Sequence, residues 1–123
     1  MIDEDTQRGI DRAVQACHKA SEDGGWWPEG TKTDKHVLGT KLALVHSEVS
    51  ETLEGLRKGL PDEHLPQYPS EHVEVADAVI RLFDYAGVRG IPLGEVMAAK
   101  MAYNAQRADH KTENRQKTGG KAF

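Results

Sequence analysis

The stretch LALVHSEVSETLEGLRKGL, residues 42–60, decides the fold class of this chain. Its apolar residues recur every three or four positions, which is the period of an amphipathic α-helix. Those apolar residues are Leu42, Val45, Val49, Leu53, Leu56 and Leu60. We expect the helix to be capped by Thr33 or Asp34 and to end at Lys58. Gly59 then supplies the glycine that commonly follows a helix C-terminus.

Three further segments show helical periodicity and are separated by glycines and prolines. They run from about Asp5 to Glu22, from a Ser70 cap to the region 87–90, and from the Ile91-Pro92-Leu93 stretch to about Asp109. The third segment is expected to bury Val75, Val79, Leu82, Phe83 and Ala86. No strand pattern is evident. The sequence therefore predicts an all-α fold, a four-helix-type bundle formed by one domain at 1–111, followed by a polar, flexible tail at 112–123.

Composition narrows the class of protein. The chain has 123 residues, a hydrophobic fraction of 37% and a net charge of −4. The low hydrophobic fraction is typical of a small domain that completes its burial in an oligomer. The negative charge argues against nucleic acid as a partner, and no apolar run is long enough to span a membrane. One cysteine, Cys17, and an acidic N-terminus indicate a cytoplasmic protein.

Two pairs of acidic residues form the most informative motif. Glu48 and Glu51 are three positions apart on one helix, and Glu74 and Asp77 repeat this spacing on the next. Residues at i and i+3 lie on the same side of a helix, so adjacent helices can bring four carboxylates together. Such a cluster needs a compensating cation. The alternative is that both pairs belong to ordinary solvated helix faces.

Carboxylate ligands select among metals. A di-iron site requires Glu-x-x-His on two helices, and none of the six histidines has a glutamate three positions before it. Zinc favours a compact group of histidines or thiolates, which is missing here. All-oxygen ligation suits Mg²⁺, with Mn²⁺ as a substitute. Because Mg²⁺ usually shares its coordination with phosphates, the motif indicates phosphate chemistry.

The fourth helical segment carries a complementary basic motif. Lys100, Asn104 and Arg107 fall at i, i+4 and i+7, which places them on one face. A lysine, an amide and a guanidinium can together bind a polyphosphate. A solvated basic helix end is the alternative, because the helix dipole favours cations there.

The tandem tryptophans Trp26 and Trp27 are the largest aromatic surfaces in the chain. They could stack on a nucleobase, or they could anchor the loop after the first helix onto the bundle. The sequence leaves both interpretations open.

Taken together, these motifs resemble those of the MazG-like all-α nucleoside triphosphate pyrophosphohydrolases. The resemblance covers about residues 36–111 and rests on the two acidic pairs followed by the lysine–asparagine–arginine helix. The Gly-Gly-Lys tail, residues 119–121, shows a weaker similarity. It implies an obligate homodimer, or a homotetramer made of two dimers. It also implies Mg²⁺-dependent cleavage of a nucleoside triphosphate into the monophosphate and pyrophosphate, with a house-cleaning role in the nucleotide pool.

The resemblance also assigns residue roles. The metal ligands would be Glu48, Glu51, Glu74 and Asp77, and the phosphate-binding residues would be Lys100, Asn104 and Arg107. Glu51 is the candidate for orienting or deprotonating the attacking water. One departure concerns the position before the first ligand, where Ser47 replaces a glutamate that family members often have.

Two alternatives to this function remain open at the level of sequence. The first is a helical dimerisation or regulatory module without catalysis, whose acidic faces only confer solubility. The second keeps the fold but changes the substrate to dUTP or a phosphoribosyl-ATP. Sequence carries almost no information about base choice.

Overall fold

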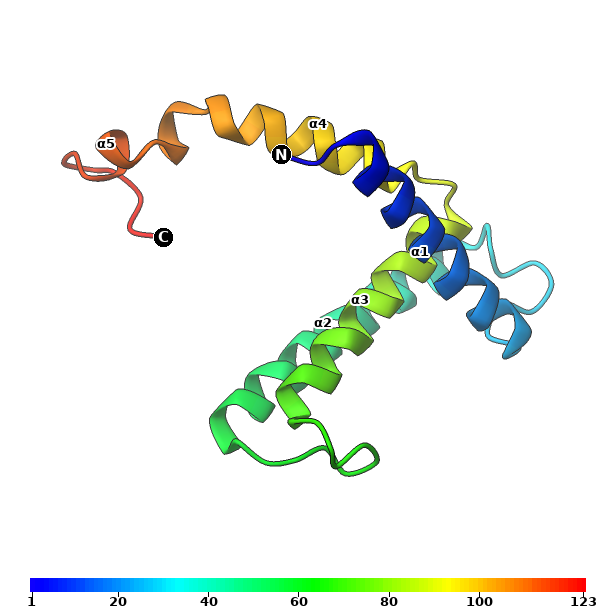
Figure 1. The fold of residues 1–123 in the computed structure, drawn as a ribbon. Coiled ribbons are helices and arrows are strands. Elements are labelled where there is room, and N and C mark those ends of the chain that lie inside the picture. The colour runs from blue at the N-terminus through cyan, green and yellow to red at the C-terminus, as the bar shows by residue number, and fades with distance from the viewer. The chain divides into compact units, whose positions relative to one another are not determined.

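A computed structural model describes residues 1–107 and 109–123 (Figure 1), and it confirms the all-α prediction. The elements are α1 (Glu4–Asp23), α2 (Lys35–Lys58), α3 (Ser70–Val88), α4 (Leu93–Gln106), the 3-10 turn η1 (Ala108–His110) and α5 (Thr112–Arg115). No strand occurs in the described part of the chain. Among those residues, no helix is both long enough and apolar enough to cross a membrane.

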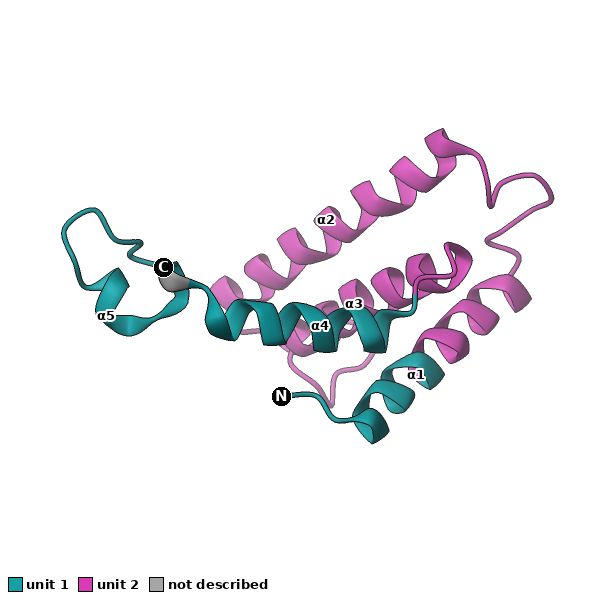
Figure 2. Cartoon of the chain, turned by 90° about the horizontal axis from the view of Figure 1, so that it is seen from above, with its two compact units in different colours: residues 1–12, 92–123 teal, residues 13–91 magenta. Residues whose placement is uncertain are grey.

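The chain forms two compact units (Figure 2). The central unit comprises residues 13–91 and holds most of α1 together with α2 and α3. The terminal unit comprises residues 1–12 and 92–123 and holds the start of α1, α4, η1 and α5. All four predicted acidic ligands therefore belong to the central unit, and the predicted phosphate-binding residues belong to the terminal unit.

The boundaries of α2 confirm the sequence prediction at both ends. The Asp34 side chain accepts hydrogen bonds from the backbone N–H groups of His36 and Val37, at 2.8 and 3.4 Å. Gly59 adopts the left-handed conformation at φ +65° and donates its N–H to the carbonyl of Gly55. A carboxylate cap and a C-terminal glycine therefore delimit this helix, as its local sequence predicts.

The predicted Ser70 cap of α3 is wrong. Ser70 is the first helical residue, Pro69 precedes it in an extended conformation, and no side chain caps this end. The loop closes on itself instead, because Ser70 N–H donates to the Leu60 carbonyl and Pro61 pairs with Pro69 in an isolated bridge. The start of α3 is thus fixed by loop closure.

The start of α4 depends on a contact within the terminal unit. Pro92 directly precedes the helix, and the Asp11 carboxylate on α1 accepts a hydrogen bond of 3.0 Å from Gly94 N–H. A Cβ at Gly94 would overlap the Gln7 backbone, so glycine permits this close approach. The helix ends at Gln106, three residues before the predicted end, and Arg107 is extended.

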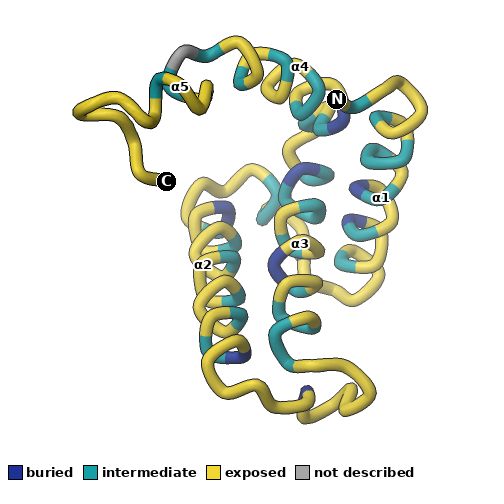
Figure 3. The backbone as a smooth tube through the Cα atoms, turned by 60° about the vertical axis from the view of Figure 1, so that its left-hand side comes forward, coloured by how far each residue is buried: buried dark blue, intermediate teal, exposed yellow. Residues whose placement is uncertain are grey.

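Helices α2 and α3 lie alongside each other (Figures 1 and 3). Most of the apolar stripe of α2, residues Leu42, Val45, Val49, Leu53, Leu56 and Leu60, is not buried by this contact. Val49, Leu53 and Leu56 are 57%, 56% and 62% exposed. On α3, Ala86 is buried as predicted and Phe83 is half-buried, but Val75, Val79 and Leu82 are exposed in the single chain. That part of the core prediction is wrong for the isolated chain, which leaves a large apolar surface on both helices.

Small residues explain why α2 and α3 pack through faces other than those that carry their exposed apolar residues. Gly55 is buried, and a Cβ there would lie 2.7 Å from the backbone nitrogen of Glu71. On α3, Ala78 is 8% exposed. The two backbones can approach closely only where side chains are this small, and these residues share their helix faces with the acidic pairs.

The predicted flexible tail contains regular structure. Helix α5 begins at Thr112, and Gly119 adopts φ +81° in a turn that reverses the chain. The Lys121 ammonium then lies 2.8 Å from the Asp109 carboxylate.

Candidate metal centre

Three of the four predicted metal ligands meet between α2 and α3. Glu48, Glu74 and Asp77 each place a carboxylate oxygen within 4.8 Å of the others. We call these three residues the acid cluster. Glu74 and Asp77 lie one helical turn apart on α3, and Glu48 reaches them from α2. The predicted convergence of acids from neighbouring helices is thus present for these three.

The close packing of α2 against α3 makes this site partly dry. The Glu48 side chain is only 14% exposed. Burial raises the pKa of Glu74 to about 7, and a hydrogen bond to Glu48 together with the negative charges of the surrounding acids acts in the same direction. Burial, followed by the charge of Glu48, also raises the pKa of Asp77. These acids repel one another and lack sufficient positive charge nearby.

Arg81 provides part of the compensation. Its Nε donates to Glu48 Oε1 at 3.0 Å, which joins α3 to α2. Asp77 lies four residues before Arg81 on the same helix, yet the ion pair is made with Glu48 on the neighbouring helix. The guanidinium is 40% exposed, and it lowers the pKa of Asp77 without reversing the rise caused by burial. Among the described residues, this partly solvated ion pair is the only one made by a carboxylate of the acid cluster.

Glu51, the fourth predicted ligand, lies outside the acid cluster. Its side chain is exposed on α2, and it lines a cavity of about 320 Å³ together with Glu74. Its charge contributes to the raised pKa of Glu74. Glu51 is thus close enough to act on a molecule in the cavity, while the other three acids form the compact group.

The same cavity is lined by an acid that the sequence analysis missed. Asp62 is 8% exposed, and its Oδ2 accepts hydrogen bonds from the backbone N–H groups of His64 and Leu65, at 3.0 and 2.8 Å. Its charge helps to raise the pKa of Asp77. A proline followed by an aspartate is a turn signal, but only the folded loop shows that it adds negative charge near the cluster.

The predicted phosphate-binding residues have defined surroundings within the terminal unit. The Lys100 ammonium lies 4.8 Å from the centre of the Tyr103 ring. Asn104 Oδ1 is buried and has no hydrogen-bond partner among the described residues. Arg107 lies just beyond α4, so the three residues do not share one regular helix, and its guanidinium forms a two-point contact with Asp109 at 3.0 and 2.6 Å.

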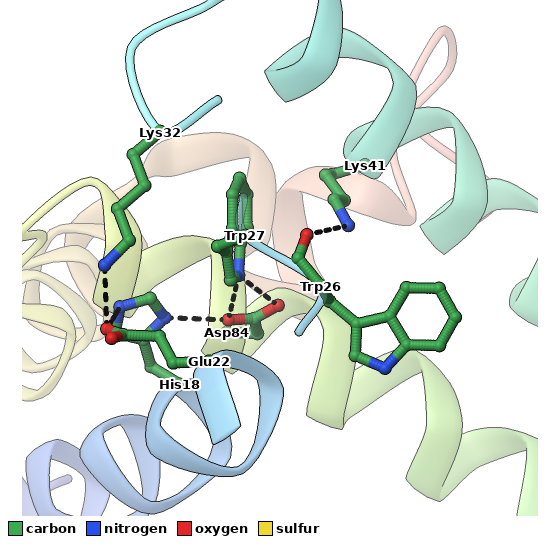
Figure 4. Close-up of polar contacts among 7 residues, drawn as sticks. All are labelled: His18, Glu22, Trp26, Trp27, Lys32, Lys41 and Asp84. Atoms are coloured by element: carbon green, nitrogen blue, oxygen red, sulfur yellow. Dashed lines mark hydrogen bonds and ion pairs between the residues drawn. The ribbon is translucent and has the colours of Figure 1, made fainter. Parts of the chain in front are cut away.

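The two tryptophans differ sharply in their surroundings (Figure 4). Trp27 is 8% exposed, and its Nε1 donates to both carboxylate oxygens of Asp84, at 3.0 and 3.2 Å. Trp26 is 67% exposed. The Lys41 ammonium lies over both rings, at 5.7 Å from that of Trp26 and 4.7 Å from that of Trp27. Trp27 thus anchors the loop, and Trp26 presents an accessible aromatic surface.

A second ionic group, which sequence analysis did not find, surrounds His18 (Figure 4). His18 Nδ1 lies 2.9 Å from Asp84, and its Nε2 lies 2.6 Å from Glu22, which also binds the Lys32 ammonium at 2.8 Å. We call His18, Glu22, Trp27, Lys32 and Asp84 the histidine cluster. Gly87 makes room for the imidazole, since a Cβ there would lie 2.5 Å from that of His18. The sequence signal, a histidine beside the apolar face of α1, was too weak to identify it.

The chemistry of the acid cluster fits a hard divalent cation. Its donors are all carboxylate oxygens, they converge from two helices, and the pKa values of Glu74 and Asp77 show that the negative charge is under-compensated. Mg²⁺ and Mn²⁺ prefer such ligands. The adjoining cavity leaves space for a substrate or water on the side of Glu51 and Asp62.

No protein-family model, curated protein sequence or solved structure matches this chain.

Proposed function

We propose that this protein is a metal-dependent nucleoside triphosphate pyrophosphohydrolase of the MazG-like type, with Mg²⁺ as its cofactor and Mn²⁺ as a substitute. The observation that carries the proposal is the acid cluster, in which Glu48, Glu74 and Asp77 converge in a partly buried seam. A carboxylate with a strongly raised pKa beside a cavity, as Glu74 is here, is typical of functional sites. Their sequence context, which resembles the pyrophosphohydrolases, points to phosphate chemistry.

The acid cluster would hold the metal through Glu48, Glu74 and Asp77. A bound Mg²⁺ supplies positive charge for phosphate oxygens and a more acidic water. Glu51, exposed at the wall of the cavity, is suited to orient or deprotonate an attacking water because it is not drawn into the cluster. Water attack on one phosphorus then breaks the anhydride bond, and pyrophosphate leaves.

The residues that would bind the phosphates of the substrate are proposed from the resemblance to the pyrophosphohydrolases. Lys100, Asn104 and Arg107 keep their predicted role as phosphate-binding residues. For the nucleobase, Trp26 is the better candidate of the two tryptophans, because it is 67% exposed while Trp27 is buried against Asp84. An exposed indole can stack on any base, so this contact favours binding without selecting the base.

A homodimer, or a tetramer of two dimers, belongs to the same proposal. The apolar stripe of α2 is solvent-exposed in the single chain, with Val49, Leu53 and Leu56 each more than half accessible. Exposed apolar surfaces of this extent mark interaction sites. A second copy of the chain, which carries the same stripe, would cover it through a symmetric contact.

The decisive experiment measures pyrophosphate release from the common ribo- and deoxynucleoside triphosphates with Mg²⁺. The wild-type chain should hydrolyse at least one of them. Glu51→Ala and Asp77→Ala should abolish release while circular dichroism shows intact helices. Glu71→Gln, which removes an acid from α3 outside the cluster, serves as the matched control. Full turnover by both alanine variants would remove Glu51 and Asp77 from the site.

A non-catalytic helical dimerisation module is the second candidate, and the exposed apolar stripe favours it equally. Thermal unfolding separates the two. Mg²⁺ should raise the melting temperature if the acid cluster binds it, and monovalent salt at the same ionic strength should not. A dUTP-specific or phosphoribosyl-ATP-specific enzyme remains a variant of the first proposal, which the substrate screen distinguishes.

A further inference from the structure

The C-terminal tail brings two cations onto one carboxylate. Asp109 accepts two hydrogen bonds from the Arg107 guanidinium, at 3.0 and 2.6 Å, and its Oδ2 also lies 2.8 Å from the Lys121 ammonium. The side chains of Arg107 and Asp109 are 30% and 34% exposed. Two positive charges thus share one negative charge at a partly sheltered position.

The residues around this contact also carry an excess of positive charge. Residues 92–123 contain six lysines and arginines against three acids, a net charge of +3, although the whole chain has a net charge of −4. The remaining 91 residues therefore carry −7. Within an acidic protein, this segment is the part that attracts anions.

Two consecutive glycines form the turn that places Lys121 beside Asp109. Gly119 adopts φ +81°, a conformation that side chains disfavour. A Cβ at Gly120 would overlap the carbonyl of Arg115, so the tail passes directly against the backbone of α5. Gly120 N–H also donates to the Lys117 carbonyl at 2.9 Å. The position of Lys121 is therefore set by backbone geometry.

A surface hollow lies next to the contact of Arg107 and Lys121 with Asp109. It has a volume of about 500 Å³ and is lined by Tyr103, Gln106, Arg107 and Asp109. The Arg107 guanidinium lies 5.9 Å from the centre of the Tyr103 ring, which restricts its orientation. A hollow of this size beside an oriented guanidinium can admit a phosphate group.

We propose that Arg107 and Lys121 form an anion clamp for the phosphates of the substrate or the pyrophosphate product, and that Asp109 occupies this clamp as an internal competitor. The inference rests on the proposed function for the identity of the ligand as a polyphosphate. Carboxylates and phosphates both accept two parallel hydrogen bonds from arginine, so they compete for the same donors. A polyphosphate carries more negative charge than Asp109 and displaces it.

The competition has a functional consequence. With Asp109 in place, the clamp has low affinity for anions of small total charge, such as inorganic phosphate. A polyphosphate overcomes the competitor because its charge is larger, so the internal carboxylate discriminates by anion charge. Asp109 thereby sets affinity without taking part in bond cleavage.

The test is calorimetric titration of the 123-residue chain with inorganic pyrophosphate, in the presence of a chelator so that no metal contributes. Asp109→Asn should bind pyrophosphate about tenfold more tightly than the wild type, because a charged competitor is gone. Glu113→Gln removes the same charge from α5 and serves as the matched control. Unchanged or weaker binding by Asp109→Asn, or an equal gain by Glu113→Gln, would overturn the proposal.

A second set of variants tests the contribution of the tail. In the Asp109→Asn background, Lys121→Ala should weaken pyrophosphate binding about threefold, as expected for an exposed charged contact. Gly120→Ala should weaken it similarly by displacing Lys121, although no charge is lost. Lys117→Ala removes a lysine from the same tail and should have no such effect. If the Lys117 and Lys121 variants behave alike, only a diffuse basic patch exists.

These outcomes are independent of turnover. Tighter binding by Asp109→Asn in a chain that hydrolyses no triphosphate would support the clamp and reject the proposed function. Hydrolysis by a chain in which the Asp109 variant binds pyrophosphate as the wild type does would reject the clamp alone.

Discussion

The two ionic clusters of the central unit differ in how completely their carboxylates are matched. In the histidine cluster, Asp84 and Glu22 receive a buried imidazole, an indole N–H and the Lys32 ammonium. In the acid cluster, only one of the three carboxylates forms an ion pair among the described residues, with a partly exposed guanidinium. A matched cluster stabilises the fold, whereas an under-matched cluster costs stability that a bound cation can recover. This imbalance is what makes the acid cluster the candidate functional site.

The largest expected effect comes from removing acid-cluster charge. The double variant Glu48→Gln/Asp77→Asn should lose at least about 100-fold in pyrophosphate release, or about 3 kcal/mol of transition-state stabilisation. The metal-free variant should nevertheless unfold at a higher temperature than the wild type, because repulsion within the seam is relieved. Kinetic assays and thermal unfolding check both parts. Lower stability together with lower activity would show that the acids are structural.

The opposite result is expected for the histidine cluster. Asp84→Ala leaves the His18 imidazole and the Trp27 N–H without their shared acceptor in a nearly buried place. Loss of one partner from such a group costs about 2–4 kcal/mol in the free energy of unfolding. Urea denaturation measures it. Asp23→Asn, which removes an exposed acid paired with Lys19, should change that free energy by less than about 0.5 kcal/mol.

The metal-free protein should lose stability as the pH rises. Since the pKa of Glu74 is about 7 in the folded protein, the folded state binds this proton more tightly than the unfolded chain. The stabilisation is complete below about pH 4.5, the ordinary range of glutamate, and is lost as the pH rises through about 7. Allowing for solvent screening, we expect a loss of about 1–2 kcal/mol.

Denaturation between pH 5 and pH 8 measures this dependence, and Glu74→Gln should flatten it. Glu71→Gln, on the same helix outside the cluster, should retain it. Saturating Mg²⁺ should also reduce the slope in the wild type, because the cation takes over the role of the proton. A slope that persists in Glu74→Gln would assign the proton to another group.

The smallest effect concerns Arg81, which competes with a cation for Glu48. Arg81→Gln should bind Mg²⁺ about threefold more tightly, because the partly exposed ion pair at 3.0 Å no longer has to be broken. The metal-free variant should be slightly less stable. Titration calorimetry with Mg²⁺ decides the matter, with Arg57→Gln on the exposed side of α2 as the control. Weaker Mg²⁺ binding would mean that Arg81 positions Glu48 for the metal.

Local sequence predicted the helices because the signals that start and stop them are local. Asp34 caps α2, Gly59 ends it, and the spacing of Glu74 and Asp77 places them on one face. The same reasoning failed at Ser70, where loop closure through Leu60 fixes the helix start. Prediction was accurate where neighbouring residues determine the end of a helix, and it failed where a contact with another segment determines it.

The sequence by itself determined an all-helical chain with acidic residues repeated at one-turn spacing. Only the tertiary structure decided which side of α2 faces α3, because that choice depends on the close approach permitted at Gly55 and Ala78. The same approach brings Glu48 to Glu74, leaves Glu51 exposed and pairs Arg81 across the seam. Periodicity places residues on helix faces, but the charge balance of a site depends on which faces meet.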